Sequence, residues 1–172
     1  MVTFNTLLRS ILAAAALAVV PGGLRAQLAP GAPFPSLASA GLVGTVPETA
    51  GKVVLVDFWA SWCAPCKASF PFYSQLNTTY GSRGLVVLAV SVDKDPSAYA
   101  SFVKQLKPSF VTVQDARQKL VADVQVPTMP TSYLVDRTGK VRFLHAGFHG
   151  DQTEHEVLKE VEALLGEKGP GS

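Results

Sequence analysis

The feature that most constrains this chain is an apolar run followed closely by its only two cysteines. Residues 52–60 read KVVLVDFWA, and this near-continuous run of β-branched and aromatic side chains predicts a strand covered on both faces. Cys63 and Cys66 come next. Beyond them apolar side chains recur at helical spacing, at Phe70, Tyr73, Leu76 and Tyr80. The sequence therefore predicts a central strand, a cysteine pair at a helix start, and a helix that Pro71 should kink.

The spacing of the two cysteines indicates reactivity. Their loop is too short to stabilise a fold much, so we interpret the pair as redox-active. At a helix start, unpaired backbone N–H groups and the helix dipole stabilise a thiolate, which makes Cys63 the predicted attacking sulfur. Cys66, one turn further and more buried, is predicted to resolve the mixed disulfide, while Pro65 holds the turn between them. Trp59 and Trp62 are predicted to form an apolar rim around the sulfurs.

Two other interpretations of the cysteine pair are half of a zinc site and inert buried thiols. His145 and His149 have the spacing of zinc-finger histidines, but they lie much further from Cys66 along the chain than a finger allows. We therefore expect no metal site. His145, His149 and His155 are expected to be surface or strand-end residues.

The rest of the chain alternates strand and helix patterns. Apolar periodicity predicts a strand in 84–93, a helix in 97–106, a strand in 109–115 and a helix in 116–124. This alternation is typical of an α/β fold with a parallel sheet. Residues 126–147 hold two apolar runs around the turn sequence DRTG, which predicts an antiparallel hairpin. A last helix is predicted over 151–166, with Thr153 and Glu156 as a capping box.

The two ends of the chain differ from its body. A short apolar run at 11–20 resembles a bacterial export signal, so residues 1–26 are predicted to be a signal peptide or an N-terminal membrane anchor. Residues 27–47 are predicted to be an extended lead-in that tethers a domain over 48–166, and residues 167–172 a disordered tail. We therefore expect a periplasmic or exported protein, released or anchored to the inner membrane, in an oxidising compartment. Without residues 1–26 the 15 basic residues fall to 13, against 13 acidic ones, so no nucleic-acid partner is expected.

Several motifs together resemble a known family. Residues 56–67, VDFWASWCAPCK, resemble the active-site motif of thioredoxin, and the order of elements is similar to that of the exported TlpA/ResA family. Residues 129–141, MPTSYLVDRTGKV, resemble the cis-proline loop and hairpin of that family, and Gly147 matches its glycine near the last strand. Residues 96–122 are similar to the TlpA/ResA-type insertion. The resemblance spans about residues 33–165 and implies a thioredoxin fold, with a central mixed β-sheet flanked by helices.

Asp57 lies within the predicted central strand, where thioredoxin has a buried carboxylate. Burial disfavours the charged form, so the pKa of Asp57 should be raised, and the side chain could then exchange a proton with Cys66. The alternative is a strand-end aspartate in solvent, which the surrounding apolar run disfavours. Ala89 replaces the lysine that partners this carboxylate in thioredoxin. Lys67 is expected to add positive potential near the thiolate.

Pro127 and Pro130 are the two candidates for a cis peptide bond, and the resemblance selects Pro130. It implies that the backbone of Met129 pairs with an extended client beside the disulfide. Pro127 is interpreted as an ordinary turn proline. The residues expected to contact substrate are Trp62, Pro65, Met129 and Thr131.

The resulting hypothesis is an envelope thiol–disulfide oxidoreductase that reduces client disulfides through Cys63 and Cys66, with no cofactor besides that redox-active pair. The resemblance implies clients of the cytochrome c maturation or copper-site assembly type, and a membrane reductant as electron source. A disulfide-donating oxidase is the first alternative, because the motif alone does not set the redox potential. A copper-binding or redox-adaptor module is the second. A peroxidase is disfavoured, because no threonine precedes Cys63 by three positions and no distant resolving cysteine exists.

Overall fold

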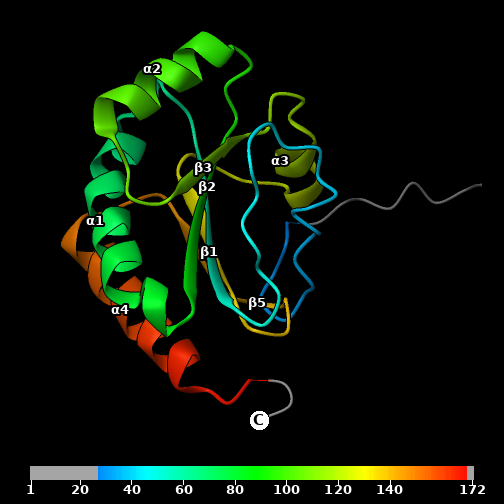
Figure 1. The fold of residues 1–172 in the computed structure, drawn as a ribbon, viewed down its shortest axis with the longest axis vertical. Helices are drawn as coiled ribbons and strands as arrows, with labels where there is room; N and C mark the ends of the chain where they lie inside the picture. Colours follow the sequence, from blue (N-terminus) through cyan, green and yellow to red (C-terminus); the bar gives the residue numbers. More distant parts are fainter. Residues whose placement is uncertain (1–26, 170–172) are drawn as a thin grey trace, which may run out of the picture.

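The protein is built on one mixed five-stranded sheet, with strands in the order β3-β2-β1-β4-β5. The computed structural model describes residues 27–169 of the chain (Figure 1). The strands are β1 (Val53–Trp59), β2 (Leu85–Ser91), β3 (Val111–Gln114), β4 (Thr131–Val135) and β5 (Val141–Ala146). The first three strands are parallel, whereas β4 is antiparallel to β1, and β5 to β4. The predicted central strand, mixed sheet and hairpin are therefore confirmed.

Helices cover one face of the sheet almost completely. The helical elements are α1 (Ala64–Tyr80), the short 3-10 helix η1 (Gly81–Arg83), α2 (Pro96–Leu106), α3 (Lys119–Val124) and α4 (Asp151–Gly166). Figure 1 shows α1 and α4 on one side of the sheet, and α3 with the leading segment of the chain on the other. Pro71 lies inside α1 without ending it. The region of the predicted insertion, residues 96–122, supplies α2, the edge strand β3 and the start of α3.

The continuous apolar run of β1 has a direct structural explanation. All seven of its residues are buried, because both faces of the strand are covered. Asp57 and Trp59 contact α1, through a hydrogen bond to Tyr73 and an edge-on ring contact with Phe70. Val54, Val56 and Phe58 point to the opposite face, since side chains alternate along a strand.

The leading segment, residues 27–47, covers that opposite face; we call it the strap. It forms two isolated antiparallel bridges, one near each outer strand of the sheet. Pro33 pairs with Lys140, just before β5, and Val43 pairs with Gln114, at the end of β3. Leu37, in the middle of the strap, is buried as part of the hydrophobic core. The expectation that this segment is a tether is therefore wrong, because its apolar residues pack on the sheet. A pocket of about 160 Å³ lies between the strap and the sheet.

The start of α4 differs from the predicted capping box. The helix begins at Asp151 after Gly150, so Thr153 lies in the first turn and is buried. The Thr153 hydroxyl accepts a hydrogen bond from the His149 backbone N–H at 3.0 Å. The threonine therefore stabilises the loop before the helix, and the capping-box prediction is wrong.

The predicted terminal segments fall largely outside the described residues. The expected signal peptide or anchor, residues 1–26, lies wholly outside them. Of the predicted tail, residues 167–169 are described, and the Glu167 carboxylate there pairs with Arg142 through contacts of 2.7 and 2.9 Å. Within residues 27–169, none of the helices has the length and apolar character needed to cross a bilayer.

Candidate active site

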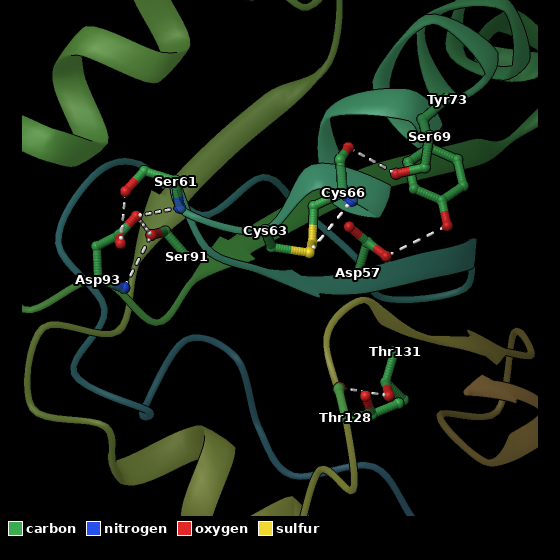
Figure 2. The surroundings of a disulfide bond; sticks show 10 residues. All are labelled: Asp57, Ser61, Cys63, Cys66, Ser69, Tyr73, Ser91, Asp93, Thr128 and Thr131. Atoms are coloured by element: carbon green, nitrogen blue, oxygen red, sulfur yellow. Dashed lines mark hydrogen bonds between the residues drawn. A yellow bond between two sulfur atoms is a disulfide. The ribbon is translucent and has the colours of Figure 1, made fainter. Parts of the chain in front are cut away.

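The two cysteines form a disulfide at the start of α1, with an S–S distance of 2.07 Å (Figure 2). Cys63 is the N-cap residue, in extended backbone geometry, and its sulfur accepts the Cys66 backbone N–H at 3.2 Å. Pro65 occupies the first turn, where a helix needs no donor from that position. A thiolate on Cys63 would therefore lie against unpaired N–H groups and the positive end of the helix dipole, which stabilise the charge.

Exposure distinguishes the two sulfurs and their neighbours. Cys66 is completely buried, as predicted, whereas Cys63 is 5% exposed. Trp62 is 73% exposed beside it, and Pro65 is also exposed. Trp59 is fully buried against the rings of α1 and α2, so the prediction that it forms part of an apolar rim is wrong. An incoming protein would meet Trp62, Pro65 and the Cys63 sulfur.

Asp57 is fully buried beneath the helix that carries the disulfide. Its Oδ1 accepts a hydrogen bond from the Tyr73 hydroxyl at 3.2 Å (Figure 2). Burial raises the pKa of Asp57 well above its usual value, and the Tyr73 hydrogen bond opposes that shift only in part. The register places Ala89 on β2 and Ser132 on β4 on either side of Asp57. The predicted burial, raised pKa and alanine neighbour are therefore confirmed.

Tyr73 is a site residue that the sequence did not identify as one. It lies seven residues after Cys66, so both side chains share the buried face of α1. Burial, reinforced by the negative charge of Asp57, raises the pKa of the Tyr73 phenol, which keeps it a hydrogen-bond donor. A buried tyrosine needs a partner for its hydroxyl, and this was the signal available in the sequence.

A second carboxylate, Asp93, fixes the loop in front of Cys63. One carboxylate oxygen accepts the Ser61 backbone N–H at 2.9 Å and the Ser91 hydroxyl at 2.8 Å, and the other accepts the Ser61 hydroxyl at 2.9 Å (Figure 2). Asp93 follows β2, and Ser61 follows β1, so these hydrogen bonds join the loops that leave two neighbouring parallel strands at the same end of the sheet. The sequence analysis missed Asp93 because only the fold brings it to Ser61.

The cis-proline loop reaches the same edge of the sheet. The Met129–Pro130 bond is cis, so the choice of Pro130 over Pro127 is confirmed. Pro130 immediately precedes β4, whose first residue, Thr131, is the register partner of Phe58 near the end of β1. The Pro130 carbonyl accepts the Gly147 backbone N–H at 2.7 Å, so the loop is tied to the end of β5.

The side chains of this loop differ in accessibility. Met129 is half-buried and packs at the margin of the core. Thr131 is completely buried, and its hydroxyl donates to the Thr128 carbonyl at 2.8 Å (Figure 2). The Thr131 side chain therefore shapes the loop, and the expectation that it contacts substrate is wrong.

The histidines lie apart from the cysteine pair. His145 is on β5, two strands from β1, and its Nε2 lies 2.7 Å from a Glu160 carboxylate oxygen. Only 11% of its side chain is exposed, and it lies next to the last residue of β5, so it is a strand-end residue, one of the two placements that we expected. Within the described part of the chain, no group of three or more potential ligand side chains is arranged to hold a metal ion. The strap pocket is also remote, because Val54 and Val135 line it at the opposite end of β1.

Comparison with known proteins supports this geometry. The Redoxin family model matches residues 27–163. The thiol-disulfide oxidoreductase ResA of Bacillus cereus is 35% identical over 91 residues, which cover 53% of this chain and 53% of the relative. The chain thus spans about half the length of the curated relatives it matches.

Solved structures show the same fold. A Chlorobium tepidum protein assigned as thiol:disulfide interchange protein DsbE is 33% identical, with a TM-score of 0.76 over 81% of this chain and 100% of that one. StoA from Bacillus subtilis is 24% identical, with a TM-score of 0.56 over 64% of this chain and 85% of that one. The fold is therefore thioredoxin-like, as the sequence motifs implied.

Proposed function

Because the chain belongs to the Redoxin family, we propose that it is a thiol–disulfide oxidoreductase that reduces disulfides in client proteins. The observation that carries this proposal is the Cys63–Cys66 pair at the N-terminus of α1, in which Cys63 is 5% exposed beside the exposed Trp62 and Cys66 is completely buried. The ResA relative and the DsbE-type structure are named for thiol–disulfide chemistry, which supports the same assignment.

The reaction begins with the reduced dithiol. The Cys63 thiolate attacks one sulfur of the client disulfide, forms a mixed disulfide and releases the first client thiolate. Cys66 then loses its proton and attacks the Cys63 sulfur, so the Cys63–Cys66 bond forms and the second client thiolate leaves. Two electrons have passed from the protein to the client.

Burial makes the second step depend on a proton acceptor. Cys66 is completely enclosed, and a buried thiol is a poor nucleophile until it is deprotonated. Asp57 is the buried carboxyl beneath the same helix face, and its raised pKa brings it closer to that of a thiol. In this proposal Asp57 accepts the Cys66 proton and returns it when the disulfide is reduced again.

The surface around Cys63 suits an extended polypeptide. Trp62 and Pro65 offer exposed apolar area beside the sulfur, and Met129 precedes the cis proline at the same sheet edge. An extended client segment can pair with the backbone at Met129 while its disulfide meets Cys63. Specificity would then arise from side chains that flank the client cysteine.

The cellular setting forms part of the proposal. We place the protein in the periplasm or another exported compartment, where residues 1–26 direct it and can anchor it. Its clients would be cytochrome c maturation or copper-assembly proteins with cysteine pairs, and a membrane thiol reductant would regenerate the dithiol. Reduction potentials of proteins with this fold range from about −270 mV, for strong reductants, to about −120 mV, for strong oxidants. The reductive direction requires a reduction potential near the lower end of this range, which equilibration with glutathione measures.

The decisive experiment compares two single substitutions in the full chain. Cys63→Ser should abolish the reduction of insulin by dithiothreitol-reduced protein, because the attacking sulfur is lost. Cys66→Ser should instead accumulate mixed disulfides with clients, which mass spectrometry identifies. Insulin reduction by Cys63→Ser at the wild-type rate would refute the proposed function.

A further inference from the structure

The two oxygens of the Asp57 carboxyl have different surroundings. Oδ1 accepts the Tyr73 hydroxyl, whereas Oδ2 is buried without a hydrogen-bond partner among residues 27–169. A buried polar atom without a partner is costly, so its presence needs an explanation, and a role in chemistry is one. The unpartnered Oδ2 is therefore the oxygen at which a proton can be added or removed without breaking a hydrogen bond to the protein.

Tyr73 reaches this carboxyl from the helix that also carries Cys66. Side chains on an α-helix lean toward its N-terminus, so the Tyr73 ring extends back toward the turn that contains Cys66. Its hydroxyl also lies within hydrogen-bonding reach of Ser132 and Ser69. The phenol is thus held between α1 and β4, and its hydrogen bond sets the orientation of the carboxyl group.

Among residues 27–169, the strand neighbours of Asp57 are uncharged. On β2 its neighbour is Ala89, and on β4 it is Ser132. Behind Ser132, His145 on β5 is engaged by Glu160 of α4. The residues that α4 buries toward the sheet are Thr153, Val157, Val161 and Leu164. Among side chains, Tyr73 alone contributes to the shifted pKa of Asp57, in opposition to burial.

We propose that Tyr73 is a positioning residue for proton exchange between Asp57 and Cys66, and that it directs the exchanged proton to Oδ2 by occupying Oδ1. The inference rests on the proposed function and deepens it. As the Cys66 sulfur attacks Cys63, the Cys66 proton moves to Oδ2, the Cys63–client bond breaks, and the client leaves as a thiolate. Tyr73 keeps its own proton throughout.

The test isolates this resolving step in the full-length protein. Reduced protein reacts with dithiobis(nitrobenzoate): the Cys63 thiolate forms a mixed disulfide with one thionitrobenzoate and releases the other as the first coloured thiolate. Stopped-flow absorbance then follows the second coloured thiolate, which leaves when Cys66 attacks the Cys63 sulfur. Tyr73→Phe removes only the hydroxyl, so the carboxylate loses a donor. The pH midpoint of the release rate should rise by about one to two pH units, because a hydrogen bond to a charged group stabilises it by that much.

Two comparisons separate positioning from a general effect on structure. Tyr80→Phe, on the same helix, removes a hydroxyl that donates to Glu162 at 2.9 Å, and it should leave the midpoint unchanged. In an Asp57→Asn background, Tyr73→Phe should have no further effect on the pH profile. A wild-type midpoint in Tyr73→Phe, or an equal shift in the Asp57→Asn background, would overturn the inference.

A second measurement does not depend on client reduction. Carbon-13 NMR of the Asp57 carboxyl in the oxidised protein should show a higher titration midpoint in Tyr73→Phe than in wild type. If the protein failed to reduce insulin, the proposed function would fall while both measurements still reported on Tyr73. An unchanged carboxyl titration would refute the role of Tyr73 even in an active reductase.

Discussion

Two buried aspartates at the active-site edge of the sheet are held in opposite ways. Asp93, 6% exposed, accepts three hydrogen bonds, which occupy both of its oxygens. Asp57, fully buried, accepts one hydrogen bond on Oδ1, and its Oδ2 has no hydrogen-bond partner in the part of the chain that the structure describes. The two aspartates lie in or just after adjacent strands. Hydrogen-bond donors occupy both carboxylate oxygens of Asp93 but only one of Asp57.

This difference shows how a fold separates anchoring from chemistry. A carboxylate that accepts several hydrogen bonds fixes the groups that donate to it. A carboxyl with few donors is costly to ionise when buried, so its proton can move at a pH where ordinary carboxyls are fully ionised. Asp93 holds the loop before Cys63, and Asp57 is suited to exchange a proton with Cys66.

The largest expected effect comes from removing the Asp93 carboxylate, whose two oxygens both accept hydrogen bonds. Asp93→Ala leaves the Ser61 and Ser91 donors without their acceptor, so the free energy of unfolding should fall by about 3 kcal/mol. Urea unfolding of the full chain with its disulfide intact measures the change. Asp95→Ala, which removes an exposed cap of α2, is the control and should cost about 1 kcal/mol. Equal losses for the two variants would show that Asp93 is not an anchor.

Replacing Asp57 should change the free energy of unfolding in the direction opposite to that expected for Asp93→Ala. Folding raises the pKa of Asp57, so wild-type stability is greatest below the unfolded-state pKa and declines as pH rises through the folded-state pKa. The decline should be about 1.4 kcal/mol for each unit by which folding raises the pKa. Asp57→Asn should remove this pH dependence while slowing the resolving step about 10²-fold.

Urea unfolding across a range of pH and the stopped-flow release assay test these two effects together. If Asp57→Asn lost stability with rising pH as wild type does, the predicted contribution of Asp57 to the pH dependence would be contradicted. Wild-type resolving rates in Asp57→Asn would remove its proposed role in proton exchange.

The smallest expected effect concerns one hydrogen bond of the anchor. Ser61→Ala removes a hydroxyl donor but leaves the Ser61 backbone N–H on Asp93, so unfolding should become easier by only about 1 kcal/mol. Ser39→Ala, which loses an exposed bond to the Ser36 carbonyl, is the matched control and should be near neutral. A loss as large as that of Asp93→Ala would mean that the anchor depends on the side chain of Ser61 alone.

Local patterns predicted the main strands and helices and the position of the cysteine pair, whereas the thioredoxin fold was predicted from the family resemblance. The β1 run, the helix after Cys63 and the DRTG hairpin each depend on residues close in sequence, and each was found where predicted. Asp57 was recognised because an ionisable side chain inside an apolar strand has no route to solvent. Pro130 required the family resemblance, since two prolines competed for the cis bond.

The features that escaped prediction depend on contacts between distant residues. Tyr73 meets Asp57 across 16 positions and Ser61 meets Asp93 across 32, and no periodicity reports such contacts. Thr131 was misassigned because its rotamer, which only the fold sets, turns the hydroxyl to Thr128. The strap lacks any regular repeat, so its packing on the sheet could not be inferred from its composition.

The strap has a consequence for the two outer strands of the sheet. Outer strands with unpaired backbone groups invite other chains to add to a sheet, which leads to aggregation. Here Val43 occupies part of the β3 margin, and Pro33 pairs beside β5. The protein thus shields the margins of its own sheet with its own leading segment. In the proposed function a client strand would pair instead with the backbone at Met129, beside the disulfide.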